Sequence, residues 1–433
     1  MEERRPRKRR PRPGFVLNAL CLIVILICFA IGGIQSVAAR HQAEKQAAAE
    51  AAALQAQQEE ERRLAEEQAA ALEASKYDFT FSFMGDLNLA DDWSPMQHLK
   101  ARENGIEDCI GPELLQLMRD ADLFCVNNEF AFTTRGQALA GKRWIIHGDP
   151  ANVSILEEMG VDLVTLANNH IYDMGPDGLT DTLATLDGAG ILRVGAGENI
   201  VEASAPVYVE RQGVTVGFVD ACNAEHTRYT PEATEDSSGV LLCYEYDKFL
   251  SSVREAKENA DFVIAMVHWG TDYVYETSDG QRDLGHQLID AGADVVIGAH
   301  SHCIQGIEYY NNCPIFYGLG TCWFNNKTLA TYMLQLHFQG DMNGGTITST
   351  VLPGMQDNWV TRLAPTEEEA TSTTDLILQY SNGVYFERDT DSELYAYVLH
   401  EGQAPAAEAS PEDAGTDDAA PESEPDLGET GEA

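Results

Sequence analysis

Five apolar runs of strand length in this chain each lead into side chains that can bind metal. The runs are residues 79–84, 123–126, 163–167, 262–267 and 295–297. The candidate ligands that follow them are Asp86, Asn88, Glu129, Asn169, His268, His300 and His302. In open α/β sheets, bound molecules and ions lie beyond the carboxyl ends of the strands. We therefore expect these side chains to meet at one edge of the folded sheet.

The ligand types define the chemistry. Imidazole, carboxylate and amide oxygen together suit Mn, Fe, Zn or similar divalent ions. The set is too large for one tetrahedral zinc and fits two metals that share a bridging ligand. Two such ions roughly 4 Å apart polarise a phosphoryl oxygen and generate a hydroxide at neutral pH. The sequence therefore predicts a two-metal site.

Single parts of this pattern have structural alternatives. A Gly-Asp pair after a strand, as at Asp86, is often an ordinary turn, and His268 alone could be a core histidine. The Gly-x-His-x-His segment is more specific, because His300 and His302 would point the same way in an extended chain. The order of all five strand ends favours the metal site.

His170 is predicted to act as a general acid rather than as a ligand. It directly follows Asn169, and in a site of this kind it would face the leaving group. Asp173 lies three residues further on and could orient His170, although a plain turn carboxylate is an equal alternative. The basic residues between the second and third runs are treated as solvated loop charges, one of which could reach an anionic substrate: Arg135, Lys142 and Arg143.

The charge of the chain is strongly acidic. It carries 28 basic and 70 acidic residues, a formal net charge of −42. Nucleic-acid backbones attract Lys and Arg, so the composition argues against nucleic acid as a partner. An anionic polymer or phosphoester substrate would have to be held locally, by metal ions.

The N-terminal region predicts a membrane partner. Residues 1–14 are mostly basic, and residues 15–36 contain an uncharged apolar stretch long enough to span a bilayer. By the positive-inside rule, the N-terminus is cytoplasmic and the body lies on the extracellular side of the cell membrane. We prefer an uncleaved single-pass signal anchor to a cleaved signal peptide, because the apolar stretch is long.

The remaining chain divides into three predicted segments. Residues 37–76 are mostly helix formers with few large apolar side chains and predict a solvated helical stalk, whose many alanines speak against a true coiled coil. Residues 77–400 form the main domain, with its core at 77–330. Residues 401–433 contain no Lys or Arg and are rich in Ala, Pro, Glu and Asp, which predicts a disordered acidic tail.

Within the main domain, apolar runs alternate with helical patterns, which is typical of an α/β sheet. The expected helices are 152–159, 179–186 and 282–291, and 214–219 and 315–317 are further strands. Beyond the core we expect strands at 331–338 and 346–351 and helices at 373–380 and 392–399. Nine cysteines form no metal-binding spacing, and Cys303 with Cys313 is the best candidate for a disulfide.

These motifs resemble those of the bacterial capsule-synthesis (CapA, poly-γ-glutamate) proteins, a branch of the calcineurin-like metallophosphoesterases. The resemblance covers about residues 77–330 and rests on FMGDLNLAD, DLFCVNNEF, VTLANNHIYDMG, MVHWGTDY, GAHSHCIQG and IFYGLGTCWFNN. It implies a four-layer αββα sandwich with two mixed sheets. It also implies two divalent ions, a link to capsule polyglutamate synthesis, export or anchoring, and other capsule-synthesis proteins as partners.

Two positions depart from the superfamily pattern. Its first motif is Asp-x-His, whereas this chain has Asp86-Leu87-Asn88, and Glu129 stands where the superfamily has a bridging aspartate. Both differences leave the affinity of one metal and the level of phosphatase activity open.

Three functions are compatible with these residues: an extracellular metal-dependent phosphoesterase, a non-catalytic protein that binds or exports polyglutamate through its metals, and a metal-dependent amide hydrolase. A general acid at His170 favours a hydrolase.

Overall fold

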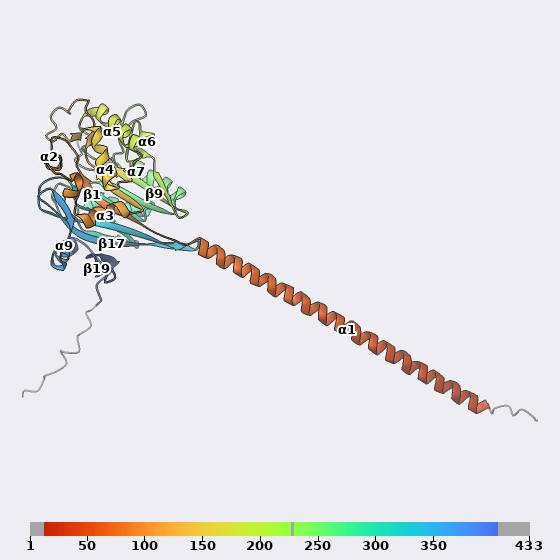
Figure 1. The fold of residues 1–433 in the computed structure, drawn as a ribbon. Helices are drawn as coiled ribbons and strands as arrows, with labels where there is room; N and C mark the ends of the chain where they lie inside the picture. The colour runs from red at the N-terminus through yellow and green to blue at the C-terminus, as the bar shows by residue number, and fades with distance from the viewer. Residues whose placement is uncertain (1–12, 227–228, 406–433) are drawn as a thin grey trace, which may run out of the picture. The chain divides into compact units, whose positions relative to one another are not determined.

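The computed structural model describes residues 13–226 and 229–405 (Figure 1). The chain divides into two compact units, with the boundary between Lys76 and Tyr77. The predicted basic segment before residue 13 and most of the predicted acidic tail, from residue 406 onward, lie outside the described residues.

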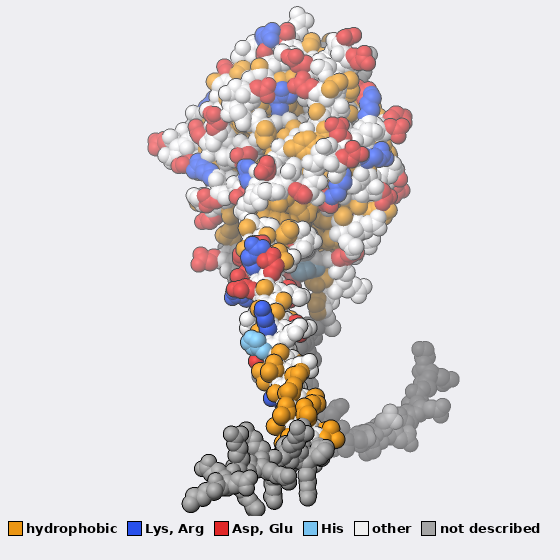
Figure 2. All heavy atoms as spheres, turned by 90° about the vertical axis from the view of Figure 1, so that its right-hand side faces the viewer, with side chains coloured by type: hydrophobic (Ala, Val, Ile, Leu, Met, Phe, Trp, Pro, Cys, Tyr) orange, Lys and Arg blue, Asp and Glu red, His pale blue; other side chains and the backbone are white. Residues whose placement is uncertain are grey.

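A single helix, α1 (Pro13–Ala74), forms almost all of the described part of the first unit. Its apolar side chains, among them Leu20, Ile25 and Phe29, are exposed. Figure 2 shows hydrophobic side chains gathered at one end of this helix and charged side chains further along it. The predicted helix of the stalk is confirmed, and by length and composition α1 is a candidate membrane span.

The larger sheet of the second unit is mixed. Its strands are β1 (Tyr77–Leu87), β2 (Leu123–Asn128), β5 (Leu163–Thr165), β6 (Leu192–Val194), β15 (Thr321–Trp323), β16 (Leu329–Asp341), β17 (Gly344–Asp357), β18 (Val360–Leu363), β19 (Val384–Arg388) and β20 (Tyr397–Glu401). Their order is β19-β20-β17-β16-β1-β2-β5-β6, with β15 beside β1 and β18 beside β17. Strands β1, β2, β5 and β6 are parallel, whereas β16 and β17 are antiparallel to their neighbours.

The smaller sheet has a parallel centre with antiparallel edges. Its strands are β8 (Val207–Arg211), β9 (Val214–Cys222), β11 (Phe262–His268), β12 (Val295–Ala299), β13 (Ile307–Tyr310) and β14 (Cys313–Phe316). They are ordered β13-β14-β12-β11-β9-β8. Two short pairs complete the strands: β3 (Ala131–Phe132) with β4 (His147–Gly148), and β7 (Ala196–Gly197) with β10 (Gly239–Val240).

The two sheets pack against each other through side chains that alternate along the strands. On β11, Ile264 and Met266 join a buried cluster that includes side chains of both sheets, whereas Val263 joins a different cluster. The rings of Phe81 on β1 and Phe218 on β9 lie 6.0 Å apart in that shared core. A period of two residues is what a strand buried on both faces requires.

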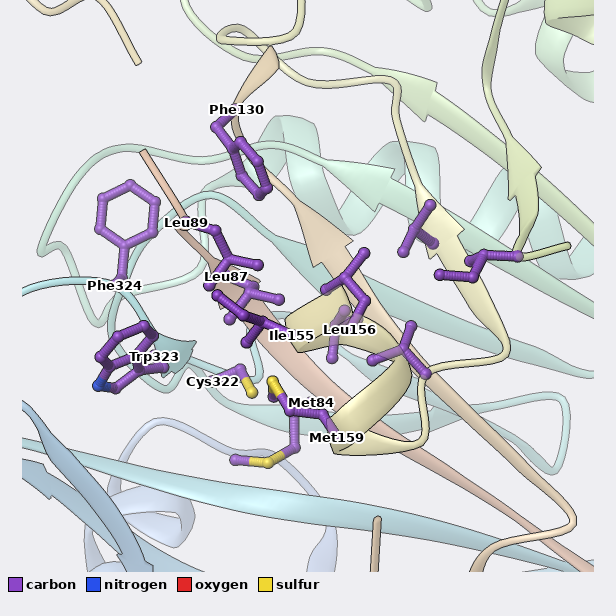
Figure 3. Packing of buried hydrophobic residues seen from close by; sticks show 14 of the residues in the cluster. Met84, Leu87, Leu89, Phe130, Ile155, Leu156, Met159, Cys322, Trp323 and Phe324 are labelled. Atoms are coloured by element: carbon purple, nitrogen blue, oxygen red, sulfur yellow. The ribbon is translucent and has the colours of Figure 1, made fainter. Parts of the chain in front are cut away.

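Helices pack against both sheets. The helices are α2 (Ser94–Lys100), α3 (Pro112–Asp120), α4 (Val153–Met159), α5 (Gly175–Ala189), α6 (Ile200–Ser204), α7 (Asp247–Asn259), α8 (Asp279–Ala291) and α9 (Glu367–Gln379). Helices α3, α4 and α5 share a core with the larger sheet, and Figure 3 shows Leu156 and Met159 of α4 near Met84 and Leu87 of β1. Helices α7 and α8 share another core with the smaller sheet. The predicted α/β class with two mixed sheets is confirmed, and the four-layer order stays a prediction.

Most of these elements were predicted correctly from the sequence, and two features were predicted wrongly. All seven named strands of the core are confirmed, as are the long strands that became β16 and β17. The helix expected at 392–399 is wrong: Tyr397 and Leu399 are buried at alternate positions of β20, which pairs with β17 and β19. The expected disulfide is also wrong, because Cys303 and Cys313 are free thiols.

Candidate metal centre

The predicted ligands lie at the ends of strands from both sheets. Asp86 is near the end of β1 and Glu129 follows β2 in the larger sheet, whereas His268 ends β11 and His300 follows β12 in the smaller sheet. The expectation of a single sheet edge is therefore corrected. Because the sheets pack face to face, the carboxyl ends of their parallel strands converge from two sides.

Direct contacts join these side chains. His302 Nδ1 lies 2.8 Å from Asp86 Oδ2, and His268 Nε2 lies 2.9 Å from Asn169 Oδ1. Two groups of side chains each bring ligand atoms within 4.8 Å of one another: Glu129 with His268 and His300, and Asp86 with Glu129 and His302. Glu129 belongs to both groups, as a bridging carboxylate would.

Two buried side-chain atoms in these groups have no hydrogen-bond partner among the described residues, and both could bind a divalent cation. These atoms are Glu129 Oε1 and His300 Nδ1. An unpaired buried acceptor costs roughly 1–3 kcal/mol, and a cation between these atoms would remove that cost. All of the side chains in the two groups are buried, so their positions are fixed by packing.

Burial shifts the pKa values of the carboxyl groups and the imidazoles in opposite directions. Burial, and then the nearby Asp86, raise the pKa of Glu129 well above its ordinary value. Burial, and then the neighbouring histidines, lower the pKa of His300 to about 4 and that of His268 well below its ordinary value. Burial raises the pKa of Asp86, but hydrogen bonds with His302 and Asn127 bring it below its ordinary value. Metal ligands must be deprotonated, so the lowered pKa values of His268 and His300 favour binding, whereas a cation would have to displace the proton that burial favours on Glu129.

The backbone that carries the two histidines after β12 is strained. His300 has φ 92° and His302 has φ 53°, so this segment is a tight turn and the expected extended chain is wrong. Left-handed φ values at non-glycine residues cost about 1–3 kcal/mol each and cluster at functional sites. The turn still aims both rings at the cluster. On β1, Gly85 permits a close backbone approach, because an added Cβ would lie 1.9 Å from Gly320 O.

Asn88 lies beside the cluster rather than within its described contacts. Its Oδ1 accepts a hydrogen bond from the Ala90 N–H at 2.8 Å, and its Nδ2 is buried without a partner among the described residues. The role of Asn88 as a ligand stays a prediction.

His170 and Asp173 form a buried pair next to Asn169. His170 Nδ1 lies 2.8 Å from Asp173 Oδ2, which also accepts the Ile146 N–H at 2.7 Å. Burial lowers the pKa of His170, and the charge of Asp173 partly opposes that shift. Asp173 thus contacts His170 as an orienting carboxylate would.

Lys142 differs from the solvated loop charge that was expected. Its side chain is only 6% exposed and forms an ion pair with Asp173. Its Nζ also donates to the backbone oxygen of Asn169. Lys142 therefore links Asp173, the partner of His170, to the backbone of Asn169, a candidate ligand. Arg135, by contrast, is exposed and pairs with Asp177 and Asp181.

Asn127 is a central residue that sequence reasoning missed. Its Nδ2 lies 2.7 Å from Asp86 Oδ1, 3.2 Å from Glu129 Oε2 and 3.3 Å from His268 Nδ1. Its Oδ1 accepts a hydrogen bond from Asn168 at 3.1 Å. Residues two apart on a strand share a face, so the pairing of Asn127 with Glu129 was a usable signal.

Asp272 was missed as well. One of its carboxylate oxygens lies 3.5 Å from His300 Nε2. Metal-binding histidines commonly direct their second nitrogen to a carboxylate, which fixes the ring orientation. Since His300 Nδ1 is the unpaired atom, Asp272 is placed to orient this candidate ligand. Nothing in the spacing of the sequence marks Asp272.

The fold and the ligand set define an α/β protein with a candidate divalent-metal centre. The sequence profile described as "Bacterial capsule synthesis protein PGA_cap" matches residues 80–326, more than half of the chain. The protein belongs to this family, and the predicted resemblance is confirmed.

Curated relatives include capsule proteins of several bacteria. The PGA biosynthesis protein CapA of Bacillus subtilis is 30% identical over 271 residues, which cover 61% of this chain and 68% of that protein. The capsule biosynthesis protein CapA of Bacillus anthracis is 34% identical over 210 residues, 46% of this chain and 49% of that protein. A probable polyglutamine synthesis accessory protein of Mycobacterium tuberculosis is 38% identical over 211 residues, 46% of this chain and 54% of that protein. The chain spans about half the length of the latter two.

Solved structures with a similar arrangement include phosphoesterases. A putative 5'-nucleotidase from Staphylococcus aureus has a TM-score of 0.39 at 16% identity, covering 69% of this chain and 58% of that one. A phosphatase from Mycoplasma pneumoniae has a TM-score of 0.40 at 13% identity, covering 65% of this chain and 95% of that one.

Proposed function

We propose that this protein is a membrane-anchored, two-metal hydrolase of the phosphoesterase type that acts outside the cell in capsule polyglutamate synthesis or anchoring. The observation that carries the proposal is that Glu129 belongs to both ligand groups, as a bridge between two ions would. The His170–Asp173 pair next to Asn169 supports a hydrolase over a protein that only binds.

The residues divide into ligands and a proton donor. Asp86, Glu129, Asn169, His268, His300 and His302 would hold the ions, with Asn88 as a further candidate. Two ions such as Mn, Fe or Zn would supply Lewis-acid charge to the attacked group. Asp173 holds Nδ1 of His170, so Nε2 remains to donate a proton to the leaving oxygen. Lys142 holds the carboxylate of Asp173 in place.

The membrane anchor rests on α1. Its apolar side chains are exposed, and the preceding sequence is rich in Arg and Lys. An uncleaved anchor predicts that the chain resists extraction by alkaline carbonate. It also predicts that protease added outside spheroplasts removes the main domain. Release of the full domain by carbonate would contradict the anchor.

Activity is tested on the full chain in detergent. Bound metal is measured by elemental analysis, and hydrolysis of phosphoesters and γ-glutamyl amides is followed for the wild type and His170→Ala. We expect about two ions per chain and turnover that requires His170. Amide but not ester cleavage would assign the amide-hydrolase function instead. Metal retention without hydrolysis of either substrate class would contradict the enzyme and favour a polymer-binding function.

A further inference from the structure

A cleft lies between the start of α3, the strand β18 and residues 393–395 of the second unit. Its volume is about 530 Å³, which is within the range of ligand-binding pockets. Its lining comes from the segments 107–113, 360–365 and 393–395. The last two segments lie beyond residues 80–326, which match the family profile. None of the candidate metal ligands lines this cleft, so it is separate from the metal centre.

The floor of the cleft is apolar. Ile110 and Ala364 line it and are only 1% and 6% exposed. Leu363 and Leu394 are partly buried and pack against the core that the larger sheet shares with α3. Ala364 and Tyr395, by contrast, belong to a small separate cluster. The cleft is therefore lined by two hydrophobic clusters, and an apolar side chain that enters it would be removed from water.

Carboxylates outnumber cations in the lining. The acidic side chains are Glu107, Asp108, Glu113 and Glu393. The one cation among the described lining residues is Arg362, and its Nη1 lies 2.6 Å from Oε1 of Glu369. The charge of Arg362 is thus compensated by a carboxylate outside the lining, and the acidic charge of the cleft remains.

Two of the four carboxylates lack a partner. Glu107 lies 3.6 Å from Arg119, and Asp108 accepts hydrogen bonds from Asn104. Glu113 and Glu393 form no ion pair within residues 13–226 and 229–405. Both are exposed, so a cation from another molecule can reach them.

A further cation lies beside the cleft. Cζ of Arg388 is 5.1 Å from the centre of the Tyr395 ring. Its Nη1 donates to the backbone oxygens of Asp389 and Ala396, and not to a carboxylate of the cleft. Arg388 therefore leaves Glu113 and Glu393 without a counter-charge.

The strand β18 is at an edge of the larger sheet. It pairs with β17 on one side, and its described pairing on the other side is a single bridge between Thr361 and Ile110. Edge strands offer backbone hydrogen-bonding groups to another extended chain, and apolar pockets beside such an edge receive alternate side chains of that chain. This arrangement favours a polypeptide over a compact ligand.

We propose that this cleft binds an extended segment of a partner polypeptide in which apolar side chains alternate with Lys or Arg. Alternate side chains of an extended chain point to opposite faces, so apolar ones can enter the cleft while basic ones reach Glu113 and Glu393. The chain's own residues 406–433 contain no Lys or Arg and would be repelled. Its basic residues 4–12 contain no apolar side chain other than proline. The inference is independent of the proposed hydrolase.

Binding is tested with a fluorescent heptapeptide in which Lys alternates with Val. It is titrated against the full chain in detergent, and all variants share the same micelle, so peptide bound by detergent cancels in the comparison. The double variant Glu113→Gln/Glu393→Gln should weaken binding by about tenfold, the size of two exposed ion pairs. Glu393→Gln alone should give part of that loss. A heptapeptide in which Lys alternates with Ser should bind the wild type at least about tenfold more weakly, because it loses the apolar contacts.

The matched control is Glu258→Gln, which removes an exposed carboxylate from α7. It should leave binding within about twofold of the wild type, and bound metal should be unchanged in every variant. An equal loss in Glu258→Gln would show that net charge alone holds the peptide and would overturn the inference. So would equal binding of the Lys–Val and Lys–Ser peptides, or no loss in the double variant. Displacement of the peptide by an equal concentration of spermine would assign the cleft to small polyamines instead of a polypeptide.

Discussion

Nδ1 of His170 lies 2.8 Å from Oδ2 of Asp173, in a pair whose side chains are 9% and 0% exposed. The other oxygen of the same carboxylate is paired with Lys142. A buried histidine held in this way presents its second nitrogen in a fixed direction, which is the property that a proton donor needs.

The first prediction concerns proton donation. His170→Gln should lower kcat for an alkyl phosphoester by about 10²- to 10⁴-fold, because an alkoxide leaving group needs a proton. The loss should be much smaller for a p-nitrophenyl ester, whose leaving group is stable as an anion. Steady-state kinetics on both esters and bound metal are measured together. The control is His286→Gln. It replaces a histidine of α8 that contacts Glu308 and lies outside the two ligand groups. Equal losses on the two esters would argue against an acid.

The second prediction concerns the buried ion pair. Lys142→Met leaves the fully buried carboxylate of Asp173 without its cation, and should lower the free energy of unfolding by about 3–5 kcal/mol. Urea unfolding measures this. The double variant Lys142→Met/Asp173→Asn should regain part of the loss, since no unpaired charge remains. Arg135→Met, which removes a cation that is 57% exposed, should cost less than about 1 kcal/mol. Similar costs for Lys142→Met and Arg135→Met would contradict a stabilising role of the buried Lys142–Asp173 ion pair.

The third prediction concerns metal content. Glu129→Gln should lose more metal than His300→Ala, because Glu129 belongs to both ligand groups and His300 to one. We expect roughly two ions per chain in the wild type, about one after His300→Ala and less than one after Glu129→Gln. Elemental analysis of the purified full chain measures the content, with His286→Ala as the control. Unchanged metal in His300→Ala would refute the assignment of the site.

The fourth prediction concerns Asp220, a buried carboxyl that belongs to neither ligand group. Burial raises its pKa well above the ordinary value, although the N–H groups of Leu166 and Ala167 donate to its Oδ2. A raised pKa in the folded state gives stability that is complete below the unfolded pKa, about 3.9, and is lost as pH rises through the folded pKa. Between those two values, stability should fall by about 1.4 kcal/mol per pH unit from this group.

Asp220→Asn is the matched variant for this effect. Its amide oxygen can accept the same two N–H groups, and it does not ionise. The free energy of unfolding of the wild type should therefore fall relative to that of Asp220→Asn as pH rises above about 4. Urea titrations at several pH values measure the difference. Parallel pH curves for the two proteins would contradict a raised pKa of Asp220 in the folded state.

The sequence alone determined the strands and the residue types at their ends. Runs such as Phe262–Val267 are apolar on both faces because both faces of β11 are buried, and the polar residue that follows each run lies at or just beyond the carboxyl end of its strand. This local rule placed Asp86, His268 and His300 near a common centre. The helix α1 was also predictable from the sequence, because its residues have high helix propensity and its second half has few large apolar side chains that could pack in a core.

Tertiary structure decided what depends on distant partners. Asp86 meets His302 across 216 residues, and no local pattern reveals that two sheets share the site. Lys142 is indistinguishable from a solvated loop charge until the loop folds over Asp173. The last strand, β20, was mistaken for a helix because its state depends on pairing with β17 and β19. Local propensity fixes which segments are apolar, but the free energy of long-range pairing and burial selects their neighbours.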